Sequence, residues 1–457
     1  MAGIGFEIRK ILEKDTLLSI VEAYGLAGLI SSGPWVLSVI GVMIIGVLSF
    51  GLVVPQTLIV QFLVSVTYLM ACSLILTGFL QLMFTRFVAD RLFEGRRDII
   101  LANLMGALWL TITVAGASGT AVLYFLFDES LLYELLMLAN FVVLCGMWIA
   151  VIFLSSMKQY LQIVALFFVG YTIAVLGSLG MTPYGLPGLL GGVLLGHSFL
   201  FFSFLYLIIR EYPGARFVAF DFTRRRQIFV SLIFTGLFFN AAVWVDKFIF
   251  WFTPETSQPV IGPLRASLIY DLPIFLAYLS IIPGMAVFLV RMEADFAEHY
   301  DQFYNAVREG DTLQHIYYYK DQMVYTARQG IYEIFKVQGM TVVILLLWGE
   351  DILELIGISP LYLRLFYVDV IGVSVQVLLL AILNVLFYLD YRRLALGLCG
   401  FFLVANAALT WLSIQLGAAF FGYGFAVSVA LTVIIGLWWL SWKMDRLEYE
   451  TFMLQGR

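Results

Sequence analysis

The stretch Gln227–Phe252, QIFVSLIFTGLFFNAAVWVDKFIFWF, decides the fold class of this chain. About 20 apolar residues in a helix cover the ~30 Å hydrocarbon core of a bilayer. The stretch follows the basic run Arg224–Arg226 and carries Asp246 and Lys247 within its apolar body. Each charge at mid-bilayer costs roughly 2.5–3.5 kcal/mol on insertion scales, so such side chains usually face protein or water. The stretch therefore predicts a transmembrane helix that borders a hydrophilic space.

Composition extends this prediction to the whole chain. Of 457 residues, 62% are apolar and 12% are charged, whereas soluble domains contain about 25% charged residues. The net charge of -5 argues against nucleic acid as a partner. Cys72, Cys145 and Cys399 lie in apolar stretches without a C-x-x-C pair, so we expect neither a disulfide framework nor a metal site.

Hydropathy predicts an all-α membrane protein with about twelve transmembrane helices. Before the first span, Ile4, Ile8 and Ile11 share one side of a short helical pattern, so the segment 1–19 is expected to be an amphipathic helix on the inner membrane surface. This segment lacks the features of a signal peptide. The predicted spans lie near residues 20–47, 57–84, 99–127, 131–154, 161–181, 188–209, 227–252, 265–290, 337–358, 361–389, 394–416 and 423–442.

Basic residues provide an independent test of this layout. With a cytoplasmic start and an even number of spans, 23 of the 26 Lys and Arg residues fall in loops predicted to be cytoplasmic. The opposite loops carry acids such as Asp128, Glu129 and Glu255. This asymmetry is the one that the positive-inside rule requires, and it predicts that both termini are cytoplasmic.

The number of spans suggests two lobes of six helices, at residues 20–210 and 211–457, with a substrate path between them as in transporters with parallel repeats. One segment of the second lobe, 291–336, is too long to be a simple loop. Its apolar residues have helical spacing on both sides of Gly310–Asp311. Two helices of about 20 residues would extend about 30 Å into the cytoplasm as a hairpin. The hairpin either packs only on itself or forms a docking platform for a partner.

Three basic residues fall outside the cytoplasmic loops, and each is close in sequence to an acid. The pairs are Lys247 with Asp246, Arg265 with Asp271, and Arg364 with Asp369. Because successive spans run in opposite directions, all six side chains are expected at a similar depth in the outer part of the membrane. They either neutralise one another along a transport path or form ion pairs that only hold the helices in register.

Other residues of the apolar spans suggest contacts or hinges. Asn240 adds a polar group to the second half, either as a path contact or as a helix–helix hydrogen bond. Gly33 and Pro34 lie in the middle of the first span, and Pro273 and Pro283 lie in the eighth. Proline removes a backbone donor and clashes with the preceding turn, so each site is either a static kink or a hinge for alternating access.

Motifs for catalysis or nucleotide binding are missing from the sequence. It contains no G-x-x-x-x-G-K-[ST], H-E-x-x-H or G-x-S-x-G pattern. We therefore expect a protein that is not an enzyme and holds no cofactor or metal, with a coupling proton or sodium ion left open.

Four stretches resemble the Pel exopolysaccharide exporter family, PelG. They are GIGFEIRKIL at 3–12, YGLAGLISSGPWVLS at 24–38, DRLFEGR at 90–96 and WVDKFIFW at 244–251. The resemblance extends over the whole chain, including the 291–336 insertion, and places it near the multidrug/oligosaccharidyl-lipid/polysaccharide (MOP) exporter superfamily.

This resemblance implies a two-lobed, flippase-like protein of the bacterial inner membrane. It also implies export of an amino-sugar polymer of the biofilm matrix to the periplasm, next to a cytoplasmic glycosyltransferase and membrane subunits of the same system. The segment 291–336 is the candidate docking platform for these partners. Two alternatives stay open: a proton- or sodium-coupled antiporter for small molecules or lipid-linked oligosaccharides, in which Asp246, Asp271 or Asp369 binds the ion, and a scaffold that transports nothing.

Overall fold

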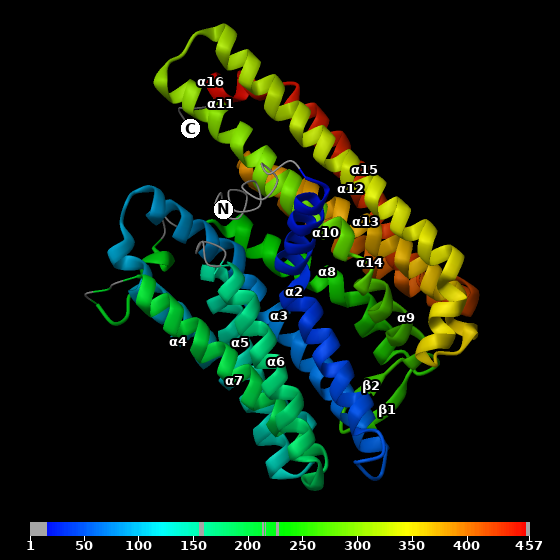
Figure 1. Cartoon of the computed structure of the whole chain (residues 1–457). Coiled ribbons are helices and arrows are strands. Elements are labelled where there is room, and N and C mark those ends of the chain that lie inside the picture. The colour runs from blue at the N-terminus through cyan, green and yellow to red at the C-terminus, as the bar shows by residue number, and fades with distance from the viewer. Residues whose placement is uncertain (1–15, 155–159, 213, 215, 225–227, 454–457) are drawn as a thin grey trace. The chain divides into compact units, whose positions relative to one another are not determined.

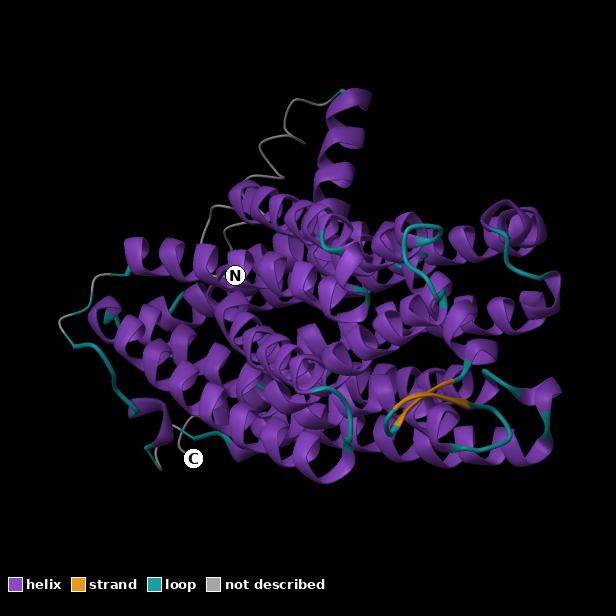
Figure 2. Cartoon of the chain, turned by 90° about the horizontal axis from the view of Figure 1, so that it is seen from below, coloured by secondary structure: helices purple, strands orange, loops and turns teal. Residues whose placement is uncertain are grey.

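The computed structural model describes residues 16–154, 160–212, 214, 216–224 and 228–453. Figure 1 follows this chain from one end to the other, and Figure 2 shows that helices make up nearly all of it, with a single small hairpin of strands in the described part. The amphipathic helix predicted at 1–19 lies mostly outside the described residues. The predicted all-α membrane fold is confirmed.

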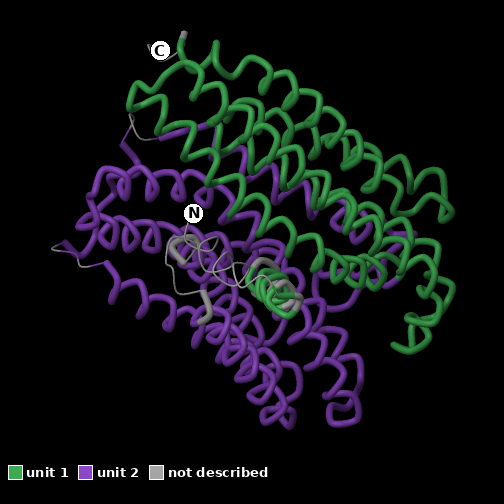
Figure 3. Tube along the Cα trace, turned by 45° about the horizontal axis from the view of Figure 1, so that its top comes forward, with its two compact units in different colours: residues 1–32, 269–457 green, residues 33–268 purple. Residues whose placement is uncertain are grey.

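The chain forms two compact units, which Figure 3 distinguishes by colour. Unit 2 comprises residues 33–268, and unit 1 comprises residues 1–32 and 269–457. These divisions differ from the predicted lobe boundary at 210/211. The reason is that the first part of α2 (Leu17–Ser49) packs in unit 1 and that α8 (Val230–Phe252) packs against α3 (Thr57–Phe93) in unit 2. The two lobes of six spans stay a prediction about the transport architecture.

Among the described residues, unit 2 holds the later part of the first long helix, six further α-helices, three short 3-10 helices and the strand hairpin. These elements are α2 (Leu17–Ser49), α3 (Thr57–Phe93), η1 (Arg97–Ile99), α4 (Ile100–Leu126), α5 (Leu131–Leu154), α6 (Tyr160–Gly180), η2 (Thr182–Tyr184), α7 (Leu186–Glu211), η3 (Asp221–Thr223), α8 (Val230–Phe252), β1 (Gln258–Ile261) and β2 (Leu264–Ala266). Small residues let α6 and α7 approach closely, because a Cβ atom at Gly192 would lie 2.0 Å from the backbone nitrogen of Ser178.

Unit 1 is built around α13 (Leu363–Tyr388). Of its most apolar 18-residue stretch, 78% is buried, which is the largest share among the described spans. The start of α2 joins this unit through Ala23 and Ala27, which pack against Ala286 and its neighbours. The further elements are α9 (Leu268–Leu279), α10 (Ile282–Phe288), the π-helix η4 (Leu289–Phe296), α11 (Ala297–Glu309), α12 (Leu313–Ile356), η5 (Pro360–Tyr362), α13 (Leu363–Tyr388), α14 (Arg392–Leu416), η6 (Ala418–Phe420), α15 (Tyr423–Met444) and α16 (Leu447–Met453).

Each of the twelve predicted spans overlaps helix in the described part of the structure. Among the described residues, nine helices are long and apolar enough to cross a membrane, and ten if the bent pair in the eighth predicted span counts as one. The first predicted span lies in α2, and the ninth forms the second half of α12.

The eighth predicted span, 265–290, is not one straight helix. Residues 264–266 form strand β2, α9 begins only at Leu268, and the axis bends by 42° between Leu279 and Ile282. Pro273 lies inside α9, and Pro283 lies in the first turn of α10, where its missing N–H costs little. Gly33 and Pro34 lie within α2 at the division between the units. The eighth span is therefore kinked in the structure. A hinge role for the two prolines of this span and for Gly33 and Pro34 stays a prediction.

The predicted hairpin at 291–336 is present, with its turn at Gly310, whose φ of +68° favours glycine. One arm consists of the end of η4 and α11. The other arm is not a separate helix, because α12 continues without a break into the ninth span over 44 residues.

Candidate transport site

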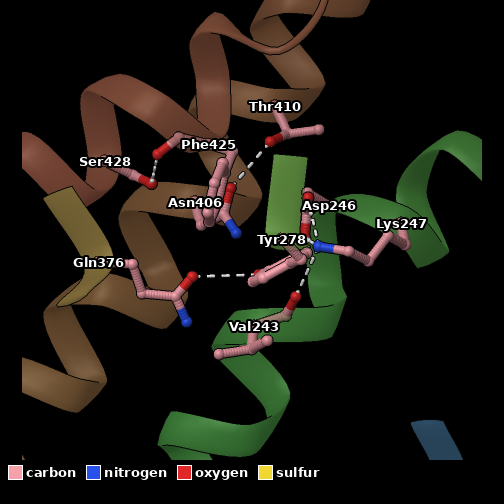
Figure 4. A network of polar contacts seen from close by, with 9 residues as sticks. All are labelled: Val243, Asp246, Lys247, Tyr278, Gln376, Asn406, Thr410, Phe425 and Ser428. Carbon is pink, nitrogen blue, oxygen red and sulfur yellow. Dashed lines mark hydrogen bonds and ion pairs between the residues drawn. The ribbon is translucent and has the colours of Figure 1, made fainter. Parts of the chain in front are cut away.

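Asp246 and Lys247 lie near the C-terminal end of α8 and form an ion pair within that helix (Figure 4). The Lys247 Nζ atom donates to Asp246 Oδ2 at 3.0 Å, to Asp246 Oδ1 at 3.2 Å and to the backbone oxygen of Val243 at 2.9 Å. The side chains are 0% and 1% exposed. The three acceptors match the three protons of the ammonium group, which is what allows a lysine to be buried.

A local pair of this kind has a simple chemical capacity. Its two opposite charges lie side by side on one helix, where the ammonium group and the carboxylate offset each other. The pair presents a carboxylate and an ammonium whose hydrogen bonds can be exchanged for those of a hydroxyl-bearing or charged ligand.

Arg265 lies on strand β2 rather than inside a membrane helix, and its guanidinium binds its own hairpin. Its Nε atom donates to Ser257 Oγ at 2.9 Å, and its Nη2 atom donates to the Ser257 backbone oxygen at 3.1 Å. The Arg265 backbone oxygen accepts a hydrogen bond from Tyr68 of α3 at 2.9 Å. Arg265 thus fastens the connection after α8 to the body of unit 2.

Asn240 lies where α3 and α8 approach each other closely. Its Nδ2 atom donates to the Gly236 backbone oxygen at 3.0 Å and to Gln81 Oε1 at 3.3 Å. A Cβ atom at Gly236 would lie 2.3 Å from the Gly78 backbone oxygen. The contact to Gln81 matches the helix–helix hydrogen bond that the sequence suggested as one role for Asn240.

The remaining three predicted path residues belong to unit 1. Asp369 on α13 is 0% exposed, and Asp271 is half-buried in the first turn of α9. Gly422 has a φ of +82°, and a Cβ atom there would lie 2.9 Å from Asp369 Oδ1, so glycine lets the backbone pass directly over this carboxylate. Arg364 is exposed at the start of α13. The six charges thus divide equally between the units, and their meeting in one cavity stays a prediction.

Polar side chains also connect the helices of unit 1. Tyr278 of α9 donates to Gln376 Oε1 of α13 at 3.1 Å, as Figure 4 shows. Gln338 of α12 donates to Ser374 Oγ at 3.1 Å and accepts from the Gly284 backbone nitrogen at 3.0 Å. These bonds join α9 and α12 to α13, and α10 to α12.

Glu293, on η4, is a buried acid that the sequence analysis did not single out. Its Oε1 atom accepts from Asn384 Nδ2 at 2.7 Å, and its Oε2 atom accepts from the Tyr388 hydroxyl at 3.1 Å. The side chain is 8% exposed. Glu293 therefore links the base of the 291–336 hairpin to the end of α13, more than 90 residues later in the chain.

Comparison with known proteins identifies the family. The model of the PelG family, described as an exopolysaccharide exporter (EPS-E), matches residues 1–452. This chain belongs to the PelG family. It is thus a multi-pass membrane protein of an exporter family, as the sequence resemblance implied. No curated protein sequence matches it.

Solved structures show that this PelG-family chain has the fold of MOP transporters. A MOP superfamily transporter from Pyrococcus furiosus has a TM-score of 0.59 at 12% identity, covering 93% of this chain and 96% of that one. A multidrug resistance MATE family transporter in an outward-facing conformation has a TM-score of 0.60 at 13% identity, with the same coverage. A MATE structure in the bent conformation has a TM-score of 0.61 at 12% identity, covering 94% of this chain and 96% of that one. At such identities the likeness concerns the fold alone.

Proposed function

We propose that this PelG-family protein exports an amino-sugar exopolysaccharide of a biofilm matrix through the bacterial inner membrane to the periplasm. The observation that carries this proposal is the match to an exopolysaccharide exporter family over residues 1–452. The placement of 23 of 26 basic residues in one set of loops supports cytoplasmic termini.

The Asp246–Lys247 pair is the part of the path that the structure supports best. It places two buried charges in an apolar helix and balances them within α8. Replacing a buried ion pair by apolar residues is often neutral or stabilising, so stability alone does not account for the pair. Contact with a polar ligand would account for it. Asp271, Asp369 and Arg364 would contribute from unit 1, while Asn240 and Arg265 would shape unit 2 around the path.

Thiol labelling tests whether water reaches these positions. Cys72 is exposed, whereas Cys145 and Cys399 are buried, so the background must first be removed by replacing all three with alanine. Single cysteines at 246, 271 and 369 should then react with a membrane-impermeant maleimide in cells that secrete polymer. A cysteine at the buried core position Val377 is the control that should stay unlabelled. Protection of all three positions in every condition would exclude a hydrophilic path along them.

Direct export needs a separate measurement. Deleting the gene should stop polymer secretion while synthesis intermediates remain in the cell, and the wild-type gene should restore secretion. A proton- or sodium-coupled antiporter is the second candidate, supported by the fully buried carboxylate of Asp369. Efflux of small cations from proteoliposomes that follows an imposed ion gradient and is lost in Asp369→Asn would favour the antiporter.

We also propose that a glycosyltransferase of the same system docks on the hairpin at 291–336. The hairpin is held from one side, where Lys320 pairs with Glu448 of α16 and Arg328 lies 3.6 Å from Asp445. Burial opposes the charged form of Lys320, but Glu448 and Asp321 outweigh it and raise its pKa. Aromatic surface is available for a partner, since Tyr318 and Tyr325 are 58% and 60% exposed.

Substitution is a sharper test of docking than deletion, because deletion would also remove Glu293 and its bonds. Tyr318→Asp with Tyr325→Asp should abolish co-purification of the glycosyltransferase and leave the abundance of the exporter unchanged. The matched control is Tyr449→Asp, which alters a tyrosine of α16 that is 65% exposed. Unchanged co-purification in the double variant would contradict the docking proposal.

A further inference from the structure

A cavity of about 430 Å³ lies within unit 2, away from the ion pair of α8. Its walls come from the start of α3, the α4–α5 connection, the start of α7 and the β1–β2 hairpin. This volume falls in the range of about 300–1,000 Å³ that is usual for small-molecule sites. None of the predicted path residues is among the described residues that line it. The positive-inside layout places these loops on the periplasmic side.

The walls of the cavity are fixed by contacts between elements distant in sequence. Gln61 of α3 donates to the Val260 backbone oxygen of the hairpin at 3.2 Å. Tyr133 of α5 shares a buried hydrogen bond of 2.9 Å with Ser65 of α3. At the hairpin turn, Gly262 has a φ of +50°, and a Cβ atom there would lie 3.2 Å from the Phe127 ring. The cavity is therefore preformed, which lowers the entropic cost of holding a ligand.

The lining combines the groups that bind sugars. Glu129, Ser130 and Gln61 provide a carboxylate, a hydroxyl and a carboxamide, and the hairpin adds backbone polar groups. Pro187 and Pro259 add flat apolar surfaces. A pyranose ring needs both kinds of contact, because its hydroxyls lie around its rim and its C–H groups lie on its faces.

Charge narrows the class of ligand. Glu129 is exposed at the α4–α5 connection, beside the acids Asp128 and Glu134. No lysine or arginine is among the lining residues that the structure describes. A phosphate or carboxylate ligand would be repelled, whereas an ammonium group would be attracted. The cavity therefore favours neutral sugars and, most of all, sugars that carry a free amine.

We propose that this cavity is a saccharide subsite on the periplasmic side, which holds a short stretch of polymer with a cationic amino sugar next to Glu129. This inference rests on the proposed export function and adds a site separate from the Asp246–Lys247 pair. Binding here captures the emerging chain and opposes its return through the membrane.

Binding of defined oligosaccharides to the purified full-length protein in nanodiscs tests the subsite. The probes are a glucosamine tetramer, an N-acetylglucosamine tetramer and maltotetraose, measured by saturation-transfer NMR and calorimetry. The glucosamine tetramer should bind most tightly. Glu129→Gln should weaken that binding about tenfold, the usual scale of a hydrogen bond to a charged group, and remove the preference for the free amine. Val260→Trp should fill the cavity and abolish binding. The backbone oxygen of residue 260 remains in place for Gln61, so this contact of the wall is retained.

Two matched controls separate the cavity from its surroundings. Gln258→Trp adds the same bulk to the same strand outside the lining, and Glu255→Gln removes an exposed acid of the preceding loop. Both should bind the glucosamine tetramer as the wild type does. Equal binding by Val260→Trp, or no binding of any probe by the wild type, would overturn the subsite. The gene deletion tests the export function independently of binding. If deletion stops secretion while all variants bind the oligosaccharide equally well, the subsite is rejected and the export function stands.

Discussion

Two buried acids of this protein are held by opposite kinds of partner. Asp246 is paired with Lys247, the next residue of the same helix, so a full positive charge lies beside it. Glu293 accepts hydrogen bonds from the Asn384 amide and the Tyr388 hydroxyl, neutral groups that reach it from α13. The first arrangement balances charge within α8, whereas the second connects the base of the 291–336 hairpin to the span at the centre of unit 1.

This difference separates a transport role from a structural role. Bonds between elements distant in sequence stabilise a fold directly, as those of Glu293 do. An ion pair within one helix carries the desolvation cost of two charges, and apolar residues in its place are often as stable or more so. Its presence at 0% and 1% exposure therefore points to a function other than stability.

Charge reversal at the local pair should have the largest effect. Asp246→Lys places two ammonium groups side by side at the proposed path and should reduce polymer secretion to background. The same loss of secretion is expected for Asp369→Lys. Membrane abundance, measured by quantitative blotting, should stay near the wild-type level. The control Glu255→Lys makes the same change on an exposed loop. A parallel fall in abundance and secretion would assign both acids a purely structural role.

Removing the carboxylate that links elements should mainly lower stability. Glu293→Leu leaves the Asn384 amide and the Tyr388 hydroxyl without their acceptor, at a cost of about 3 kcal/mol in the free energy of unfolding. Thermal unfolding in detergent measures this change, with the exposed Glu309→Ala as control. An unchanged Tm together with lost secretion would move Glu293 into the transport path.

Crowding the α3–α8 contact should cost somewhat less. Gly236→Ala places a methyl group 2.3 Å from the Gly78 backbone oxygen, which requires the helices to separate. Overpacking of this kind costs about 2 kcal/mol, measurable as a lower Tm. Gly116→Ala on α4, where a Cβ atom meets nothing within 4 Å, should leave the Tm unchanged or slightly raised.

Neutralising only Lys247 distinguishes a wet site from a dry one. In a dry interior, Lys247→Met would cost about 3–5 kcal/mol because Asp246 would lose its counter-ion while buried. Both side chains are buried in the structure, so water can solvate Asp246 only if Lys247→Met opens it to a hydrophilic path; in that case we expect a loss of about 1 kcal/mol in the free energy of unfolding. The free energy of unfolding is therefore measured for Lys247→Met and for the double variant Asp246→Asn/Lys247→Met. A large loss in the single variant that is absent from the double variant would show that the pair lies in a dry interior.

The smallest effect is expected at the surface of the hairpin. Lys320→Gln removes the ion pair with Glu448 and should cost about 0.5 kcal/mol, since such pairs contribute little when partly solvated. Because the pKa of Lys320 is raised, the contact is present at neutral pH and is lost only as the pH rises above 10.5. Hydrogen exchange should rise in residues 447–453 alone. Faster exchange throughout α12 would show a larger structural role.

The spans were predictable because long apolar runs leave a chain few alternatives in a bilayer. The direct pairing of Asp246 was harder to predict. Adjacent residues of a helix do not face each other, so sequence reasoning had the charges neutralise one another along a transport path or form ion pairs between helices. In the structure, the flexible stem of Lys247 folds back along α8 and reaches Asp246. Glu293 gave no usable signal, because η4 changes the angular spacing of its side chains and its partners lie far along the chain.

The strand hairpin was likewise not predicted. Residues 258–266 mix apolar residues with glycine and proline, and the last of them were assigned to the start of the eighth span. Their pairing is supported by Tyr68 and Gln61 of α3, which bind the backbone of both strands. Such distant contacts cannot be derived from local periodicity.

The uninterrupted course of α12 has a mechanical consequence. At about 1.5 Å per residue, its 44 residues form a rod of about 66 Å. One end carries the turn of the hairpin, and the other ends at Gly357, at the far side of the ninth span. A force applied at the turn would be transmitted along this rod to its end at Gly357 without any rearrangement of secondary structure in between.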